Sequence, residues 1–432
     1  MKLLRSLWVF IVILALVEPK QVKYFFPHIL FWYYPQDVLL AFIVICYFLS
    51  KRSTTHISNV YFNVYLIFAV FSIAYLLTSL INALILPSVD GGQMINGLGR
   101  VLLQYLISPV LIICSLTFLY ANRKLQALHS FIVASLFEIG ILIVSDIFLF
   151  LPESNFLRPS VKQEILGQSW IFLGSHPIFV PKWGVTFPET QELCFFIFLS
   201  FLLLEIYQKR VPAAPVWPYR LLKVIYLCTI VITGSKGVLI GILVYLFFRN
   251  KRNLQIKLLA MLCVVFPAIY YLVHRATYDS GSFVASALSY NSIDERIFHI
   301  IFFFKLCAAH PIHLLIGFGA RQHGQLISGV YPLDFTHLTN AVSLFSIVTD
   351  SGLIGFACYL AIPIGIFLAI RGYRERLSIV SAFIANIGIP DWSLDCYIIF
   401  MLIILVTTHA LKSKEGIYQD KTCGLAVAIA KE

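Results

Sequence analysis

The sequence predicts an all-α protein, a polytopic integral membrane helical bundle of about twelve transmembrane helices with a long, partly helical external loop between late spans. Three observations lead to this fold class. The 432 residues are 59% hydrophobic and only 12% charged, with a mean hydropathy of +0.87, whereas soluble domains are about 25% charged. Apolar runs long enough to span a bilayer recur from the first residues to Leu411. Basic residues gather in clusters between these runs.

The basic clusters give the expected topology, because Lys and Arg near span ends stay in the cytoplasm. We place the spans at residues 7–17, 35–50, 60–86, 98–121, 125–151, 189–207, 219–233, 236–248, 256–273, 338–370, 377–389 and 396–411. Each even-numbered span, from the second on, is followed by basic residues, among them Lys51/Arg52, Arg123/Lys124, Lys209/Arg210, Arg249/Lys251/Arg252, Arg371/Arg374/Arg376 and the lysines of the tail. Both termini are therefore expected in the cytoplasm. The net charge of +11 is explained by topology and needs no nucleic-acid partner.

The chain is expected to be one membrane domain, residues 1–432. The first apolar run lacks a small-residue cleavage site, so we interpret it as a retained helix rather than a removed signal peptide. Two connections are long enough to form external loops of their own, residues 152–188 and 274–336, and residues 412–432 form a cytoplasmic tail. Long ordered loops often carry function.

The larger external loop has a local structure that the sequence predicts. Ser292 and Glu295 form a capping-box pattern, and a helix is expected over residues 293–309 until Pro311 ends it. Gly317, Gly319 and Gly324 then allow tight turns. These turns are expected to bring the side chains of Arg321 and His323 close to a ligand. Six of the eleven histidines lie in or beside this loop, at positions 274, 299, 310, 313, 323 and 337.

Metal and disulfide chemistry is not predicted. The nine cysteines form no CxxC pair, and most lie in apolar spans. His310 and His313 have helical spacing near Cys307, but no carboxylate completes a site and Pro311 interrupts a helix there. Hydrogen-bonded loop histidines are the better interpretation for most of the six, while one histidine acting as a base is the functional alternative. No nucleotide-binding fingerprint is present, and no cofactor is expected.

Several basic residues are left on the external side, where they are disfavoured by the rule that places the clusters. They include Arg275, Arg296, Arg321 and Lys236, and their retention favours an anionic partner such as a lipid diphosphate. The alternative is that external loops tolerate some Lys and Arg. Lys236 stands in TGSKG, between two short spans, where the alternatives are a plain hairpin turn and a phosphate contact.

Acidic residues near or within the spans leave similar alternatives. Glu138 and Asp146 lie two turns apart in the fifth expected span and should face the bundle interior, as packing partners or as a proton relay. Glu189 stands in TFPETQEL at the start of the sixth span, where a carboxylate also serves as a helix-dipole partner.

The segment from His337 to Ile370 is longer than one span, so part of it must lie outside the hydrocarbon or line a wet cavity. The run Leu353–Ile370 is long enough to cross alone. Asp350, Ser351 and Gly352 are then expected near the outer interface. The turn that holds His337 and Asn340 is expected above it, facing the external solution or a cavity under the large loop.

Four stretches of the chain resemble the family of O-antigen polymerases and O-antigen ligases: TFPETQEL, TGSKG, the run from DERIF to HPIHLLIGFGA, and the run from THLTN to DSGLIGF. The last two are the most specific, and the resemblance extends over about half the chain as one of pattern and topology. It implies inverting, metal-independent glycosyl transfer at the outer face of the bacterial cytoplasmic (inner) membrane. The donor would be a glycan on undecaprenyl diphosphate.

The resemblance also implies roles for particular residues. His337 would be the catalytic base, and Arg296 and Arg321 would bind the diphosphate, while Lys236 takes the place that an arginine usually holds. Arg275, His310, His323, Glu189 and Asn340 complete the set of expected substrate-binding residues. In the ligase pattern, however, the histidine stands eleven residues before the first glycine, a position that Ala341 occupies here. His337 lies one turn earlier, which favours the more variable polymerases over the ligases.

Three functions remain open at this point. A polymerase would join lipid-linked repeat units and would have a chain-length-regulating co-polymerase as a partner, whereas a ligase would transfer the glycan to lipid A core. A flippase or other transporter of lipid-linked oligosaccharide would also have about twelve spans. The sequence shows few charges at mid-membrane depth and no evident repeat, and the loop 274–336 favours an enzyme.

Overall fold

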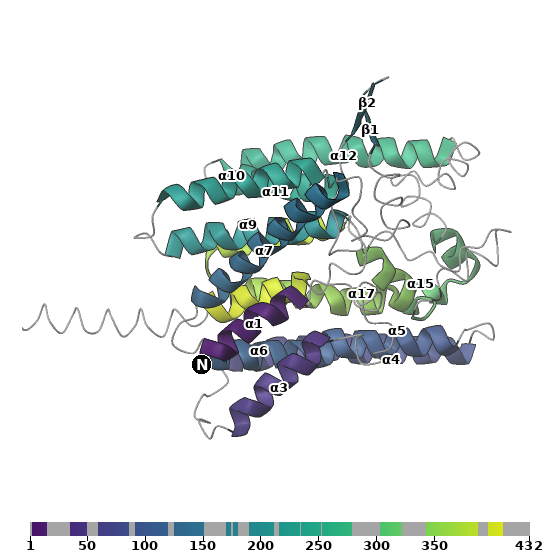
Figure 1. The fold of residues 1–432 in the computed structure, drawn as a ribbon. Coiled ribbons are helices and arrows are strands. Elements are labelled where there is room, and N and C mark those ends of the chain that lie inside the picture. Colours follow the sequence, from purple (N-terminus) through teal and green to yellow (C-terminus); the bar gives the residue numbers. More distant parts are fainter. Residues whose placement is uncertain are drawn as a thin grey trace, which may run out of the picture.

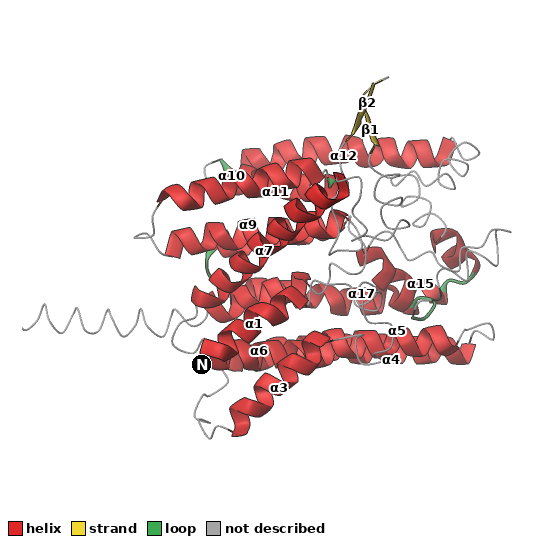
Figure 2. Ribbon diagram, viewed as in Figure 1, coloured by secondary structure: helices red, strands yellow, loops and turns green. Residues whose placement is uncertain are grey.

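The computed structural model describes residues 2–14, 35–49, 59–85, 91–119, 125–150, 170–173, 176–179, 190–210, 216–233, 235–251, 253–278, 303–320, 322, 343–387 and 396–408. These residues are almost entirely helical, which agrees with the predicted all-α class (Figure 2). The exception is a small antiparallel hairpin within the predicted loop 152–188, formed by β1 (Trp170–Leu173) and β2 (His176–Phe179), in which Trp170 pairs with Phe179.

The first half of the chain forms helices at the predicted places. They are α1 (Lys2–Leu14), α3 (Pro35–Leu49), α4 (Asn59–Ile85), α5 (Gly91–Leu102), α6 (Ser108–Leu119) and α7 (Leu125–Phe150). A π-helical turn, η1 (Leu103–Ile107), joins α5 to α6, so that the predicted span 98–121 is continuous.

The second half continues in the same way. It contains α9 (Thr190–Arg210), α10 (Val216–Thr233), α11 (Lys236–Phe248), α12 (Leu254–Tyr278), a helix over 303–309, α15 (Ile312–Ile316), α17 (Ser343–Ala369), α18 (Tyr373–Ile387) and the helix Cys396–Thr408. Most helices run along one common direction, with α10–α12 at the top of Figure 1, α17 in the middle and α4 to α6 below.

Three helical segments are long and apolar enough to cross a membrane: Asn59–Ile85, Gly97–Thr117 and Phe345–Ala369. Their length and composition indicate a membrane protein. Each of the other predicted spans also contains a helix, but several of these have apolar stretches of only 10–17 residues. The number of about twelve crossings therefore stays a prediction.

Helix α4 shows the inverted polarity of a helix that faces lipid. One face of it exposes large apolar side chains at helical spacing, namely Phe62, Leu66, Val70, Ile73, Leu77, Leu80, Ile81 and Leu84, whereas Phe68 and Phe71 are buried on the other. Its polar side chains Ser72, Tyr75, Thr78, Ser79 and Asn82 are buried instead. Lipid accepts exposed apolar groups but no unsatisfied polar ones, so this arrangement suits a bilayer.

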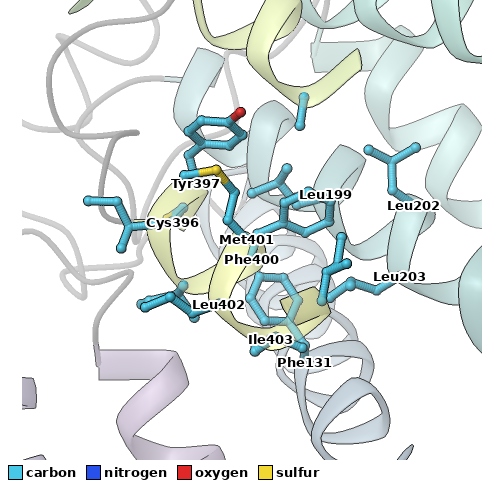
Figure 3. Packing of buried hydrophobic residues seen from close by; sticks show 14 of the residues in the cluster. Phe131, Leu199, Leu202, Leu203, Cys396, Tyr397, Phe400, Met401, Leu402 and Ile403 are labelled. Carbon is cyan, nitrogen blue, oxygen red and sulfur yellow. The ribbon is translucent and has the colours of Figure 1, made fainter. Parts of the chain in front are cut away.

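Helix α9 lies at the centre of the core. Its side chains from Leu193 to Ile206 are all buried, as expected for a helix that is apolar on every face. Figure 3 shows part of this packing, where Leu199, Leu202 and Leu203 of α9 meet Phe131 of α7 and the helix Cys396–Thr408. These hydrophobic contacts join segments that lie far apart in the chain, for example 265 positions between Phe131 and Cys396.

Ion pairs close one end of the bundle, which we call the basic end. Glu375 of α18 is fully buried and accepts hydrogen bonds from Arg210 at the end of α9, the shorter being 2.7 Å from Nη2 to Oε1. Glu205 of α9 is also buried and pairs with Lys223 of α10 and, at 3.5 Å, with Arg249 after α11. Arg210 and Arg249, from two of the predicted basic clusters, therefore lie at the same end of the bundle, as the predicted topology requires.

Candidate functional site: the glycine junction

Helix α17 is broken at Gly352, which has φ 65° and ψ −165°. This conformation is essentially restricted to glycine and interrupts the helical hydrogen-bond ladder. The sequence predicted that Leu353–Ile370 crosses alone and that Asp350 to Gly352 lie at its outer edge. The break falls at that predicted boundary, and α17 continues beyond it for about 25 Å to Ala369 at the basic end.

The loop after the helix 303–309 fills this break. The helix ends before Pro311 as predicted, α15 follows, and the chain then turns at Gly317 (φ 71°) and Gly319 (φ 95°). The amide of Phe318 donates to the carbonyl of Thr349 at 2.8 Å, and that of Gly319 donates to Asp350 at 2.9 Å. These bonds satisfy carbonyls at the broken end of a helix. We name residues 315–319 together with 349–352 the glycine junction.

The two backbones of the glycine junction leave no room for side chains at its centre. A Cβ atom on Gly317 would lie 2.5 Å from the carbonyl carbon and oxygen of Asp350. A Cβ atom on Gly352 would overlap the carbonyl of Leu315 and the amide nitrogen of Gly317. Because the clashing atoms belong to the backbone, they cannot rotate away. The predicted need for tight turns is confirmed at Gly317 and Gly319, while Gly324 lies outside the described residues.

His313 stabilises the loop from within. Its ring is buried, stacks on Phe318 at a centroid distance of 4.5 Å, and places Nδ1 2.7 Å from the carbonyl oxygen of Gly317. A carbonyl only accepts, so Nδ1 carries the proton in this contact. The interpretation as a hydrogen-bonded loop histidine is confirmed for His313. His310 is exposed, and its ring centroid lies 6.0 Å from that of His313.

Helix α4 contributes two side chains that the sequence analysis missed. The Tyr75 hydroxyl donates to Oδ2 of Asp350 at 2.6 Å, and Nδ2 of Asn82 donates to the carbonyl of Ile316 at 3.0 Å. The signal was present in the sequence, since Tyr75, Thr78, Ser79 and Asn82 recur at helical spacing in an otherwise apolar span. Such a polar stripe usually binds a neighbouring element.

A small apolar cluster, Phe303, Cys307 and Phe318, joins the helix 303–309 to the loop and packs on Phe345 and Val348 of α17. Burial raises the pKa of the Cys307 thiol to about 11. Among the described residues, no group of three His, Cys, Asp or Glu side chains is placed to hold a metal ion.

Most of the predicted site residues lie outside the described residues: His337, Arg296, Arg321, His323, Asn340 and Glu189. The other three are placed at least in part. Lys236 is the first residue of α11, after Ser235, so TGSKG is the predicted break between two helices. Arg275 lies near the end of α12, and His310 follows the helix 303–309. Glu138 is buried in α7 as expected, whereas the side chain of Asp146 is not described.

The glycine junction joins the two stretches that carry the most specific resemblance, HPIHLLIGFGA and DSGLIGF, backbone to backbone. It fixes where the chain leaves Gly319 and where it enters α17. No protein family model matches the chain, and no curated protein shows significant similarity to it.

Proposed function

We propose that this protein polymerises undecaprenyl-diphosphate-linked oligosaccharide repeat units into a surface polysaccharide, by glycosyl transfer at the outer face of the cytoplasmic membrane. The observation that supports this most is the glycine junction, in which two stretches that resemble the polymerase and ligase family contact each other. They are 30 or so positions apart in the chain. A shared site built from both stretches requires such a contact.

The location of the glycine junction also supports the proposal. It lies about 25 Å along α17 from the basic end, a separation close to the thickness of the bilayer hydrocarbon. If the basic end is cytoplasmic, as the positive-inside rule predicts, the junction stands at the external interface. A lipid-linked oligosaccharide that has reached the outer leaflet would meet it there.

The proposed reaction assigns one task to each group. His337 accepts the proton of an acceptor sugar hydroxyl, whose oxygen then forms a bond to the anomeric carbon of the donor. The bond from that carbon to the diphosphate oxygen breaks, and the diphosphate leaves with its negative charge. Arg296 and Arg321 pair with this charge as it develops, which lowers the barrier without a metal ion. Energy comes from the lipid diphosphate itself.

The test uses His337→Ala and Arg296→Ala, expressed in a strain from which the native gene is deleted. General bases typically contribute about 10²- to 10⁴-fold to a rate, so His337→Ala should reduce long chains to single repeat units on a gel. His129→Ala and Arg220→Ala serve as matched controls, because both side chains are exposed and belong to α7 and α10, which supply no residue of the glycine junction.

Two results would contradict the proposal. If both His337→Ala and Arg296→Ala still produce long polysaccharide chains at normal membrane levels of protein, the proposed site is wrong. If the deletion strain instead accumulates long chains on the lipid carrier that never reach lipid A core, the protein is a ligase and not a polymerase.

A further inference from the structure

Two buried polar side chains of α4 bind the two halves of the glycine junction separately. Tyr75 contacts Asp350 on the α17 side, and Asn82 contacts the Ile316 carbonyl on the loop side. We propose that Tyr75 and Asn82 are positioning residues, which together we call the α4 clamp, and that they hold the external loop in register with α17. The inference rests on the proposed function only for what the clamp positions.

The spacing of Tyr75 and Asn82 lets one face of α4 bind both halves of the glycine junction. Tyr75 and Asn82 are seven residues apart, which is about two helical turns, so their side chains lie above one another on the same face. Thr78 and Ser79 between them are also buried. If α4 stays fixed, the loop cannot slide along α17 without breaking one of the two hydrogen bonds.

Because both side chains are buried, the loss of either hydrogen bond is costly. The Tyr75 side chain is 4% exposed and Asn82 is fully buried, so water does not readily replace a lost partner. Asn82 is itself held by a second bond from Nδ2 to the carbonyl of Thr78 at 2.9 Å. The Tyr75 ring lies 6.0 Å from that of Phe71, a contact that Tyr75→Phe leaves in place. That substitution therefore removes the hydroxyl alone.

The clamp sets the position of the proposed reacting groups through the backbone. Arg321 follows Gly319 by two residues, a reach of at most about 7 Å, and His337 precedes the start of α17 by six. A displacement of about 1 Å at a reacting group costs up to about 10²-fold in rate. Loosening the junction should thus impair glycosyl transfer although Tyr75 lies outside the proposed set of reacting groups.

The first arm of the test measures how firmly the loop is held against α17, and it does not depend on enzymatic activity. The purified full-length chain in nanodiscs is treated with a maleimide, and the modified peptide that contains Cys307 is quantified by mass spectrometry over time. Cys307 is buried between Phe303 and Phe318, so it reacts only when the loop lifts from α17. We expect Tyr75→Phe to raise its rate about tenfold, which corresponds to about 1.4 kcal/mol. Asn82→Ala should also raise it.

Matched controls come from the same helix. Tyr65→Phe makes the same chemical change about 15 Å away along α4, on a half-buried residue, and Asn63→Ala alters an exposed amide. In both variants, the maleimide should label Cys307 at the wild-type rate. In Asp350→Ala the carboxylate that accepts from Tyr75 is already absent, so adding Tyr75→Phe should cause a smaller increase than it does in the wild type.

The second arm measures polysaccharide chain length in cells at matched protein levels. Shortened chains in Tyr75→Phe together with faster labelling would support the proposal. Unchanged labelling would overturn the clamp, and faster labelling with normal chains would overturn its positioning role. A gene deletion that leaves chain length unchanged would overturn the proposed function instead, and the labelling arm would still decide whether the clamp holds the loop.

Discussion

Replacement of Gly352 by alanine tests the glycine junction most directly. The conformation of Gly352 costs an L-residue about 1–3 kcal/mol. The added Cβ would also overlap the carbonyl of Leu315 and the amide of Gly317, so the two backbones must separate. Separation breaks the bonds of Phe318 to Thr349 and of Gly319 to Asp350, each with a net contribution of about 1 kcal/mol. We expect Gly352→Ala to lose about 4 kcal/mol of stability.

The assay is thermal unfolding of the purified protein in detergent. The quantity measured is the fraction of protein that stays monodisperse after heating. Gly140→Ala is the matched control, because Gly140 lies in α7 with no atom within 4 Å of an added Cβ. Alanine is the better helix former there, so Gly140→Ala should be neutral or slightly stabilising. Gly317→Ala should behave like Gly352→Ala, and the double variant should be little worse than either single one. Equal stability of Gly352→Ala and Gly140→Ala would refute the reasoning.

Two further predictions concern other parts of the molecule. Glu375→Gln should destabilise the protein by about 1–3 kcal/mol in the same assay, because Arg210 loses its buried partner but remains partly exposed to solvent. The control is Arg220→Gln, at an exposed position, which should change stability by less than about 0.5 kcal/mol. The Cys307 thiol is buried, and burial raises its pKa to about 11, so in the folded protein it should react with a maleimide at pH 7.5 about two orders of magnitude more slowly than a free thiol, and denaturation should restore the rate of a free thiol. Labelling of Cys307 in the folded protein as fast as that of a free thiol would show that the cluster around it is open.

The positions of the helices could be predicted from the sequence because each depends on local composition. Apolar runs of sufficient length form helices in lipid whatever surrounds them, and breaks occur at recognisable residues such as Pro311 and Gly352. The predicted end of the loop helix at residue 309 and the predicted boundary before Leu353 both agree with the structure. The hairpin of β1 and β2 was not predicted, since its short strands carry no clear signal.

The contacts that build the site could not be predicted in the same way. Tyr75 and Asp350 are 275 positions apart, and neither residue alone indicates its partner. Likewise Glu205 and Glu375 were not singled out, because each stands near a basic cluster and resembles an ordinary charge at a span end. Only the packing of α9 against α10, α11 and α18 shows that both carboxylates are buried and paired. Tertiary partners of polar groups are therefore what sequence patterns leave open.

The two ends of α17 are stabilised by different interactions, and this difference separates folding from activity. At the basic end, buried carboxylates and long basic side chains join α9, α10, α11 and α18, so a lesion there should reduce the amount of folded protein. At the other end, α4 and the glycine junction align two loop-bearing segments through short hydrogen bonds. A mild lesion such as Tyr75→Phe should leave the bundle intact and change only that alignment. Variants of the basic end should therefore lower the yield of folded protein, whereas Tyr75→Phe should shorten the polysaccharide chains when protein levels are equal.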